Sequence, residues 1–274
     1  MENVNMFCLT LNPDHLEKIE KMKYLPVGLG DQSFSKSWFQ DNTGLNISKK
    51  NKFYGEYTFH YWIWKNYLDS LNEGWIGFCQ YRKFWGEKNI DTNNLSFEKL
   101  NEFSLKKIPE EFINYESILG EPFYVNQFRF SKFLKKGLKK FISSPSLLYD
   151  KNKRNIKFHF DLFHGNGNLD RAIHLLEDDD RKDFKQFVEK NVSFNPHNMF
   201  ICKSKKILEN YYQSIFPWLQ RCEKEFGFEN LQGYGLQRIY GFLAERFLSY
   251  WFLKNCKVKE LPIIFKDLSD YKNL

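Results

Sequence analysis

The chain has 274 residues, a formal net charge of +7 and an aromatic content of 19%. This length buries one substantial core and does not require two independent domains, while the modest positive charge fits an anionic ligand or an anionic membrane surface without selecting either. The N-terminus shows no signal-peptide pattern and no window approaches the roughly 20 apolar residues of a membrane-spanning helix, so we expect neither a secreted nor an integral membrane protein.

A strand, a helix and a second strand are predicted at the start of the chain. Residues 5–10 (NMFCLT) predict a strand. Asn12 and Pro13 then predict a helix that has Asn12 as its N-cap and ends near Lys21. Residues 24–29 predict a second short strand. Strands that alternate with helices indicate an α/β fold with a mainly parallel sheet.

A polar turn follows at residues 41–51 (DNTGLNISKKN). Short hydrogen-bonding side chains surround Gly44, a composition that favours a shaped loop over a helix or strand interior. We therefore expect Asp41, Asn42 and Asn46 to contact a ligand.

The helix after this turn is rich in aromatic residues and is predicted to brace the core. Its bulky side chains recur at helical spacing and predict one buried face. That face consists of Tyr57, Tyr61, Trp64 and Leu68. The other faces are predicted to carry Glu56, His60 and Lys65.

The next predicted strand ends in a polar and cationic group of residues. Residues 75–79 (WIGFC) predict an interior strand, and Gln80, Tyr81, Arg82 and Lys83 follow its carboxyl end. Ligands of open α/β sheets bind at this edge. We therefore expect Tyr81 and Arg82 to lie in a binding site.

The middle of the chain is polar and less regular. Residues 115–125 predict one strand that returns to the sheet, and residues 128–168 are interpreted as an insertion or acceptor-side subregion. Within it, the stretch SKFLKKGLKKF alternates lysines with apolar residues. This pattern is typical of a helix at an anionic membrane surface, and also of a charged solvated helix.

The last third of the chain again predicts regular elements. Residues 194–203 predict a strand, Ser204 caps a helix that ends near residue 215, and a final strand covers residues 258–265. A long helix is predicted over residues 235–255, and its buried side consists of Leu236, Ile239, Leu243, Phe247 and Trp251.

The five cysteines lie far apart and mostly in apolar segments; they are Cys8, Cys79, Cys202, Cys222 and Cys256. An odd number at wide spacing favours reduced, buried thiols over a disulfide framework or a zinc site. The cysteines therefore predict a cytoplasmic protein.

Several of these segments together resemble a family of bacterial glycosyltransferases that build capsular polysaccharide and lipopolysaccharide, long described only as an uncharacterised domain. The matching segments are DNTGLNISKKN, YWIWKN, GFCQYRKFW, NMFICK, RIYGFLAERFLSYW and KELPIIF. The resemblance implies one GT-A-like domain over residues 1–274, with a Rossmann-type, mixed but mainly parallel sheet flanked by helices. It also implies transfer of a sugar from a nucleotide-diphosphate donor, and a hexose such as galactose on a uridine diphosphate is the first expectation.

The implied partners are a nucleotide-sugar donor and a glycan or lipid-linked glycan acceptor at the cytosolic face of the inner membrane. The basic stretch of residues 131–141 fits peripheral contact with that anionic membrane surface. No nucleic acid is expected as a partner.

Donor chemistry needs positive charge beside the leaving diphosphate. Most GT-A enzymes place an Asp-x-Asp metal motif at the end of the strand that here ends with Gln80. Because no carboxylate stands there, we expect Arg82 to neutralise the phosphates directly, since a guanidinium forms paired charge-assisted bonds with phosphate oxygens. Thr10 and Tyr81 are further expected donor contacts.

The sequence assigns no metal ligand. The run Asp178-Asp179-Asp180 follows a predicted helix and no strand precedes it, so it is interpreted as a solvated helix end. A divalent cation, Mg²⁺ or Mn²⁺, that meets the donor at Asp41 stays open as an alternative.

Inverting transfer needs a carboxylate base within reach of the acceptor hydroxyl. Glu245, in the segment GFLAERF, is the first candidate, with Glu56 as the second. Arg238 and Arg246 are expected to contact the donor phosphates or to lower the proton affinity of Glu245, although a structural Glu–Arg pair is the rival interpretation.

Three polar residues near predicted turns are the candidates for acceptor or sugar contact: His164, His197 and Asn198. Two other function classes remain open. A non-catalytic glycan-binding module would keep the aromatic surface but ignore the nucleotide, and a nucleic-acid-binding protein would weaken its binding steeply with salt.

Overall fold

The computed structural model describes residues 2–127 and 150–271. Contacts divide the chain into two units, of which the first contains Met1–Glu121, His197–Ser214 and Phe252–Leu274 and the second contains Pro122–Pro196 and Ile215–Trp251. The basic stretch of residues 131–141 lies outside the described residues. The expected single domain with an insertion at residues 128–168 stays a prediction.

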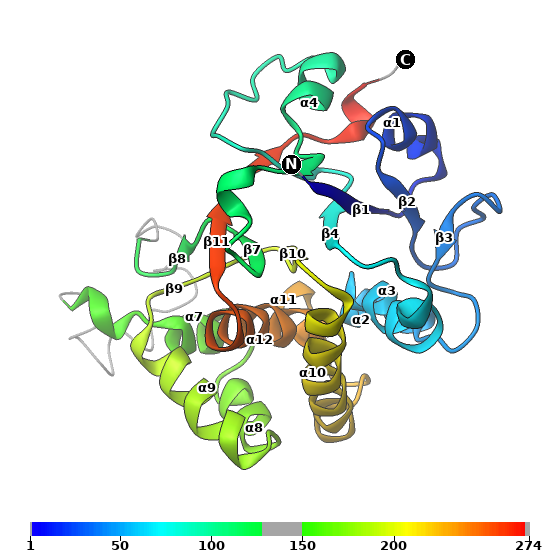
Figure 1. Ribbon diagram of the computed structural model, residues 1–274. Coiled ribbons are helices and arrows are strands. Elements are labelled where there is room, and N and C mark those ends of the chain that lie inside the picture. Colours follow the sequence, from blue (N-terminus) through cyan, green and yellow to red (C-terminus); the bar gives the residue numbers. More distant parts are fainter. Residues whose placement is uncertain (1, 128–149, 272–274) are drawn as a thin grey trace. The chain divides into compact units, whose positions relative to one another are not determined.

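The first unit is built around one mixed sheet, which has ten strands within the described ranges. Its main order is β11-β7-β10-β4-β1-β2-β3 (Figure 1). Off this path, β5 pairs with β4 and β12, and β6 pairs with β1. The strands are β1 (Glu2–Thr10), β2 (Leu25–Gly28), β3 (Phe39–Gln40), β4 (Trp75–Gln80), β5 (Lys83–Trp85), β6 (Lys107–Ile108), β7 (Ser117–Gly120), β10 (Phe200–Cys202), β11 (Val258–Leu261) and β12 (Ile263–Phe265).

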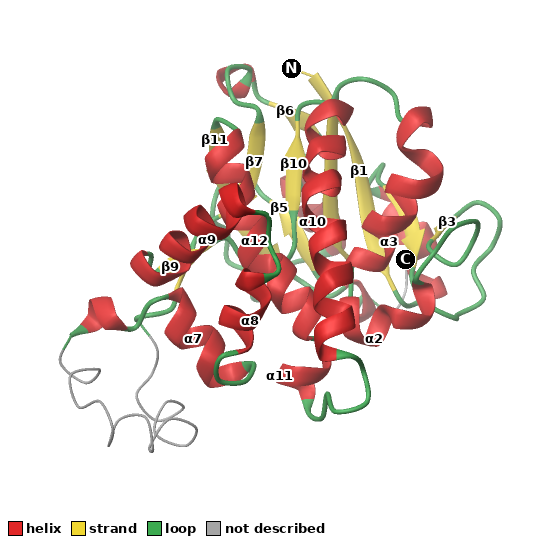
Figure 2. Ribbon diagram, turned by 90° about the horizontal axis from the view of Figure 1, so that it is seen from below, coloured by secondary structure: helices red, strands yellow, loops and turns green. Residues whose placement is uncertain are grey.

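The centre of this sheet is parallel. Strand β1 runs parallel to β2 and β4, and β2 runs parallel to β3, whereas β10 is antiparallel to both of its neighbours. Figure 2 shows β7, β10 and β1 in the sheet, where β4 lies between β10 and β1, with α3 (Tyr57–Trp62) beside β1. The predicted final strand is interrupted at Pro262, because proline cannot donate a ladder hydrogen bond.

Successive side chains of the central strands point to opposite faces of the sheet, as pleating requires. Phe7 of β1 packs on Phe59 of α3, with ring centroids 5.5 Å apart. Its neighbours Met6 and Cys8 belong to the core cluster on the other face. Two core layers therefore flank the sheet of the first unit.

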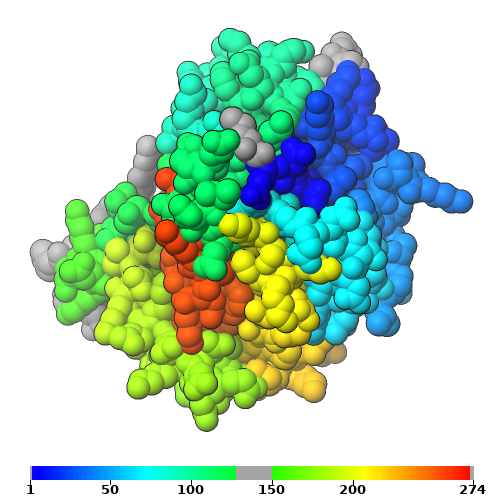
Figure 3. All heavy atoms as spheres, in the orientation of Figure 1, coloured from blue at the N-terminus to red at the C-terminus, as the bar shows by residue number. Residues whose placement is uncertain are grey.

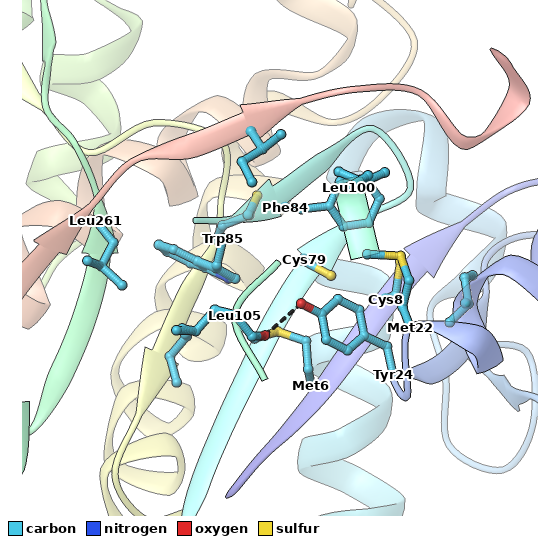
Figure 4. Close-up of a cluster of buried hydrophobic side chains, with 14 of the residues drawn as sticks. Met6, Cys8, Met22, Tyr24, Cys79, Phe84, Trp85, Leu100, Leu105 and Leu261 are labelled. Carbon is cyan, nitrogen blue, oxygen red and sulfur yellow. Dashed lines mark hydrogen bonds between the residues drawn. The ribbon is translucent and has the colours of Figure 1, made fainter. Parts of the chain in front are cut away.

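The second of these layers is shown in Figure 4. The buried side chains of Met6, Cys8, Cys79 and Trp85 gather there, and the Tyr24 hydroxyl donates to the Leu105 carbonyl at 2.6 Å. All five cysteines are free thiols, and only Cys256 is partly exposed. The expected burial is confirmed for the other four.

Short helices cover the sheet of the first unit: α1 (Leu16–Lys21), α2 (Asn51–Tyr54), α3 and α4 (Phe97–Phe103). The predicted cap is confirmed, because the Asn12 side chain accepts a hydrogen bond from the Asp14 amide at 3.0 Å. The helical turn that it caps is a 3-10 turn, Pro13–His15, which leads into α1.

The predicted buried face of the aromatic helix is partly wrong. His60 is fully buried, whereas Tyr61, Trp64 and Leu68 are only partly buried. Regular α-helix ends at Trp62, and a π-helical turn over Ile63–Tyr67 changes the helical register. The Nδ1 of the buried His60 imidazole pairs with the Tyr212 hydroxyl at 2.8 Å, and its Nε2 has no hydrogen-bond partner among the described residues.

The second unit is mainly helical. Its elements are α7 (Ile156–Phe163), α8 (Asn168–His174), α9 (Asp178–Lys190), α11 (Tyr234–Gln237) and a two-stranded sheet of β8 (Phe123–Tyr124) and β9 (Ser193–Phe194). Residues 115–125 thus form two strands in different sheets, β7 and β8, where one was predicted. The Asp178–Asp180 run forms the first turn of α9, so it begins a helix and does not end the preceding one as predicted.

Two long helices, α10 (Lys205–Phe226) and α12 (Ile239–Asn255), have residues in both units. The Ser204 hydroxyl caps α10, as predicted, through the Ile207 amide at 3.3 Å. The predicted end near residue 215 is wrong, because the helix continues through Pro217. An interior proline costs about 3 kcal/mol, and burial of Trp218, whose Nε1 donates to the Ala172 carbonyl at 2.7 Å, offsets that cost.

Candidate functional site

The carboxyl ends of four parallel strands meet at one edge of the sheet of the first unit. Thr10, Gly28 and Gln80 end β1, β2 and β4, and Asp41 directly follows β3. The antiparallel strand β10 begins at the same edge, since the Gln80 Nε2 donates to the His197 carbonyl at 2.8 Å. We call this group the carboxyl-edge cluster; its members are Thr10, Asp41, Tyr81, Arg82, His197 and Asn198.

Asp41 is the buried carboxylate of the carboxyl-edge cluster. Its side chain is fully buried, and its Oδ1 accepts a hydrogen bond of 2.9 Å from the Gly30 amide. The adjacent Thr58 hydroxyl donates to the Gly55 carbonyl at 3.0 Å. The second oxygen, Oδ2, finds no hydrogen-bond partner within residues 2–127 and 150–271. A buried, unsatisfied acceptor is costly and is a place where a ligand can supply the missing donor.

The electrostatics of Asp41 follow from this burial. Burial raises the pKa of Asp41 from 3.8 to about 6, and the Asp31 carboxylate adds to the rise. The neighbouring Thr58 hydroxyl and the Gly30 amide oppose it. At neutral pH the carboxylate is therefore largely ionised but less stable than an exposed one.

The loop after Asp41 is held by its own side chains. Asn46 donates to the Gly44 carbonyl at 3.0 Å and accepts from the Ser48 amide at 3.2 Å, so it shapes the loop. Asn42 is exposed, and its amide reaches the Gly30 carbonyl at 3.4 Å. Asn66, which the sequence did not single out, clamps Leu45 by accepting from its amide at 2.9 Å and donating to its carbonyl at 2.8 Å.

The neighbouring loop, between β2 and β3, stands out from the surface in Figure 3. Residues 31–37 of this loop are mostly exposed. Gly30 begins the loop with a φ of +75°, a left-handed conformation that glycine adopts without strain. This turn aims the Gly30 amide at Asp41.

Thr10 belongs to a row of hydrogen-bonded polar side chains that starts at the carboxyl-edge cluster. Its hydroxyl pairs with His15 Nδ1 at 2.8 Å, and His15 Nε2 pairs with the Ser269 hydroxyl at 3.0 Å. The buried His15 ring lies 5.2 Å from the ring of Tyr81. Burial lowers the pKa of His15, with a further contribution from Lys18. His15 thus positions Thr10 and Tyr81, and the sequence pattern gave no sign of it beyond its place in the turn after Asn12.

Arg82 provides an exposed positive charge beside these groups. It lies in the tight turn between β4 and β5, and its guanidinium is 5.5 Å from the ring of Tyr81. No carboxylate of the described chain pairs with Arg82. Its backbone is fixed, because the Lys266 amide donates to its carbonyl at 3.3 Å. An exposed guanidinium on a fixed backbone suits phosphate binding.

His197 and Asn198 form a strained turn before β10. Both have left-handed backbones, with φ of +81° and +54°, which are uncommon for residues other than glycine. Burial, with the charges of Lys83 and Arg82, lowers the pKa of His197 to about 3, so its ring is neutral at physiological pH. The ring lies 5.2 Å from that of Phe265, the last residue of β12.

Four of the remaining candidates belong to the second unit: His164, Arg238, Glu245 and Arg246. Glu245 pairs with the guanidinium of the buried Arg246. That guanidinium also lies 4.1 Å from the ring centre of Phe194 and 3.3 Å from His159 Nδ1. Burial, with the charges of Arg246 and His164, lowers the pKa of His159 to about 2, so its ring is neutral.

His164 and Arg238 lie near the start of α12, and Glu56 lies in the first unit. The His164 ring stacks on Phe242 at 4.0 Å, and its Nδ1 pairs with the Gly235 carbonyl at 3.0 Å. Arg238 ends α11, 6.0 Å from the Tyr234 ring centre. Glu56 is the partly buried N-cap residue of α3. The structure thus gives His164 a packing role and leaves Glu56 at a helix start.

The described carboxyl-edge residues do not form a ligand set for a divalent metal. Mg²⁺ prefers several oxygen ligands, whereas this edge offers one carboxylate, Asp41, next to the cations Arg82 and Lys83. Within the part of the chain that the structure covers, no group of three His, Cys, Asp or Glu side chains is placed to hold a metal ion.

The sequence matches the model of one protein family. That family is described as a domain of unknown function (DUF4422), and its model matches residues 9–256. No curated protein matches the sequence. Across residues 2–127 and 150–271, no helix has the length and apolar content needed to cross a membrane.

Two solved structures are similar to the chain. The bifunctional glycosyltransferase WbbM, in its apo form, aligns over 97% of this chain with a TM-score of 0.70 and 22% identity. This chain spans only 45% of WbbM. The core-mannan synthase A of Aspergillus fumigatus aligns with a TM-score of 0.33 and 11% identity over 96% of this chain and 74% of its own. The WbbM likeness confirms the expected GT-A-like α/β fold.

Proposed function

We propose that this chain, which belongs to the DUF4422 family, is a glycosyltransferase that uses a nucleotide-sugar donor. One observation carries the proposal. The carboxyl edge of the parallel strands, where open α/β sheets bind ligands, combines an orphan buried carboxylate oxygen on Asp41 with the exposed cation of Arg82. These two groups match the two ends of a nucleoside diphosphate.

Each end of the donor would meet a different group. The Asp41 Oδ2 would accept a hydrogen bond from a hydroxyl or N–H group of the nucleoside, which satisfies the buried carboxylate. Arg82 would bind the diphosphate and stabilise the negative charge that develops when it leaves. A uridine diphosphate that carries a hexose such as galactose is the donor we propose to test first.

The second half of the reaction needs a base. The base proposed from the sequence is Glu245, whose carboxylate pairs with the buried Arg246 guanidinium. The acceptor hydroxyl oxygen would attack the anomeric carbon while the bond from that carbon to the phosphate oxygen breaks. The diphosphate leaves with the electron pair, and the hydroxyl proton passes to the catalytic base. Glu56 is the alternative base.

The acceptor would be a glycan or lipid-linked glycan of a bacterial capsule or lipopolysaccharide. The resemblance of the sequence segments, rather than the site geometry, supports this acceptor. An enzyme with such an acceptor would act in the cytoplasm, or peripherally at the cytosolic face of the inner membrane.

The test is binding of nucleoside diphosphates by calorimetry, with and without Mg²⁺ or Mn²⁺. We expect UDP to bind, and Arg82→Ala to weaken its binding by about 10- to 100-fold, the worth of a hydrogen bond to a charged group. Arg171→Ala, which removes an exposed arginine paired with Glu225, is the matched control and should bind like the wild type.

Equal UDP affinity in Arg82→Ala and the wild type would remove Arg82 from the site. A chain that binds glycans but no nucleotide would instead be a glycan-binding module. Binding to nucleic acid that weakens steeply with salt would favour the third function class.

A further inference from the structure

We propose that Phe265 forms the stacking floor of a sugar subsite beside the diphosphate, an inference that rests on the proposed function. The ligand class is a sugar ring, either that of the donor or the terminal ring of the acceptor. The sequence pattern treats Phe265 only as the end of a strand. Its exposure, its fixed backbone and its place along the sheet edge support the inference.

The first observation is the direction in which Phe265 points. It ends β12, whose residues Ile264 and Phe265 pair with Phe84 and Lys83 of β5. Ile264 is 3% exposed and belongs to the core, whereas Phe265 is 52% exposed. Because successive side chains of a strand point to opposite faces, the pleat directs the Phe265 ring away from the core.

The second observation is that the ring has a built support. The His197 ring meets it edge to face, with centroids 5.2 Å apart and an interplanar angle of 80°. The backbone of His197 is held in its left-handed conformation by the Gln80 amide, which donates to its carbonyl at 2.8 Å. Lys83 in turn donates to the Gln80 side-chain oxygen at 3.1 Å. The support is therefore fixed before a ligand binds, which reduces the ordering cost of binding.

The third observation is the order of groups along the sheet. Asp41 follows β3, Arg82 follows β4, and Phe265 pairs with the strand after Arg82. Three strand spacings separate β3 from β4, about 14 Å in all. A nucleoside at Asp41 and its diphosphate at Arg82 would therefore place the attached sugar, and the acceptor ring that meets it, at Phe265.

An exposed aromatic ring beside cationic side chains favours a sugar ring as the ligand over a second nucleobase or an apolar protein partner. Sugar rings present one face of C–H groups to an aromatic ring and direct hydroxyls to polar neighbours. Phe265 supplies the apolar face, and the cationic residue Lys83, which pairs with it across β5, follows Arg82 in the chain. An apolar protein partner would have to desolvate these charges.

The experiment compares wild type, Phe265→Ala and Phe265→Tyr by calorimetry in two arms. One arm titrates UDP and a panel of UDP-hexoses; the other titrates the methyl glycosides of the same hexoses in the presence of UDP. We expect Phe265→Ala to weaken binding in one arm by about fivefold or more, and Phe265→Tyr to retain it. UDP alone should bind all three forms equally. The arm that responds identifies the donor or the acceptor ring.

Ile113→Ala is the matched control, since Ile113 is 47% exposed and belongs to the same unit. It should change neither arm. Unchanged sugar binding of Phe265→Ala in both arms would overturn the subsite. Failure of the wild type to bind UDP would count against the proposed function, and the glycoside arm, repeated without nucleotide, would still decide on Phe265.

Discussion

The Gly30 amide donates a hydrogen bond of 2.9 Å to Oδ1 of Asp41, and the other carboxylate oxygen stays buried without a partner in the described chain. The contact joins the end of β2 to the end of β3, because the Asp41 amide also donates to the Gly28 carbonyl at 3.3 Å. The site therefore contains a carboxylate that the protein alone satisfies only in part. Such a carboxylate lowers the stability of the folded chain and leaves an acceptor that a ligand can bind.

The first prediction concerns Asp41→Asn and pH. The pKa of Asp41 in the folded chain, about 6, lies above its ordinary value of 3.8, so the folded state holds the proton more tightly than the unfolded state. The protonated Asp41 carboxyl therefore contributes to the stability of the folded chain below about pH 4. This contribution is lost as the pH rises through 6 and the carboxyl ionises. At pH 7 the ionised carboxylate costs up to about 3 kcal/mol, and Asp41→Asn removes that cost.

Urea unfolding at pH 4 to 8 measures this effect. The variant should gain stability over the wild type as the pH rises, while its UDP binding weakens. Asp69→Asn, at an exposed carboxylate of the same unit, should follow the wild-type profile. A variant that is less stable than the wild type at pH 7 would show that the carboxylate has a stabilising partner.

The second prediction separates donor binding from chemistry. Glu245→Gln keeps the size of the side chain but removes the base, so we expect UDP affinity within twofold of the wild type and a loss of about 100-fold or more in transfer rate. Glu56→Gln is the control and should transfer normally. Full turnover by Glu245→Gln, with loss in Glu56→Gln, would reassign the base to Glu56.

The third prediction concerns the loss of folding stability when the buried Arg246 is replaced. Arg246→Met leaves Glu245 without its cation and removes the contact with the Phe194 ring. Breaking a buried pair by removing one partner is expected to reduce the free energy of unfolding by about 3 kcal/mol. Glu245→Gln combined with Arg246→Met should recover part of the loss, which a double-mutant cycle measures. A fully additive cycle would mean that the pair contributes nothing.

The fourth prediction concerns the loop after Asp41. Gly44 has a φ of +53°, and a Cβ there would lie 2.2 Å from the Asn66 Oδ1 that holds Leu45. Gly227, with a φ of +60° and open space around it, is the matched control. Gly44→Ala should cost at least about 1 kcal/mol more than Gly227→Ala in chemical denaturation, because it adds a clash to the same backbone strain. Equal costs would show that the Asn66 clamp adds nothing to the loop.

Much of the framework is present in local sequence patterns. The cap at Asn12, the cap at Ser204 and the apolar strand after Gly74 depend on residues a few positions apart, and all three are found in the structure. The site edge is also predictable, since parallel strands end together and Asp41 and Arg82 each follow a strand. The pairing of Asn198 with that edge follows only once β10 is known to run antiparallel.

The sequence by itself determined the α/β class, the order of strands and helices and the polar residues at strand ends, because periodicity, caps and turn composition act over short distances. Only the tertiary structure decided that His60 is buried against Tyr212, that Asn66 clamps the loop and that Phe265 is exposed beside His197. These relations join residues 21 to 152 positions apart, so no local pattern shows which partner a buried group such as His60 will find.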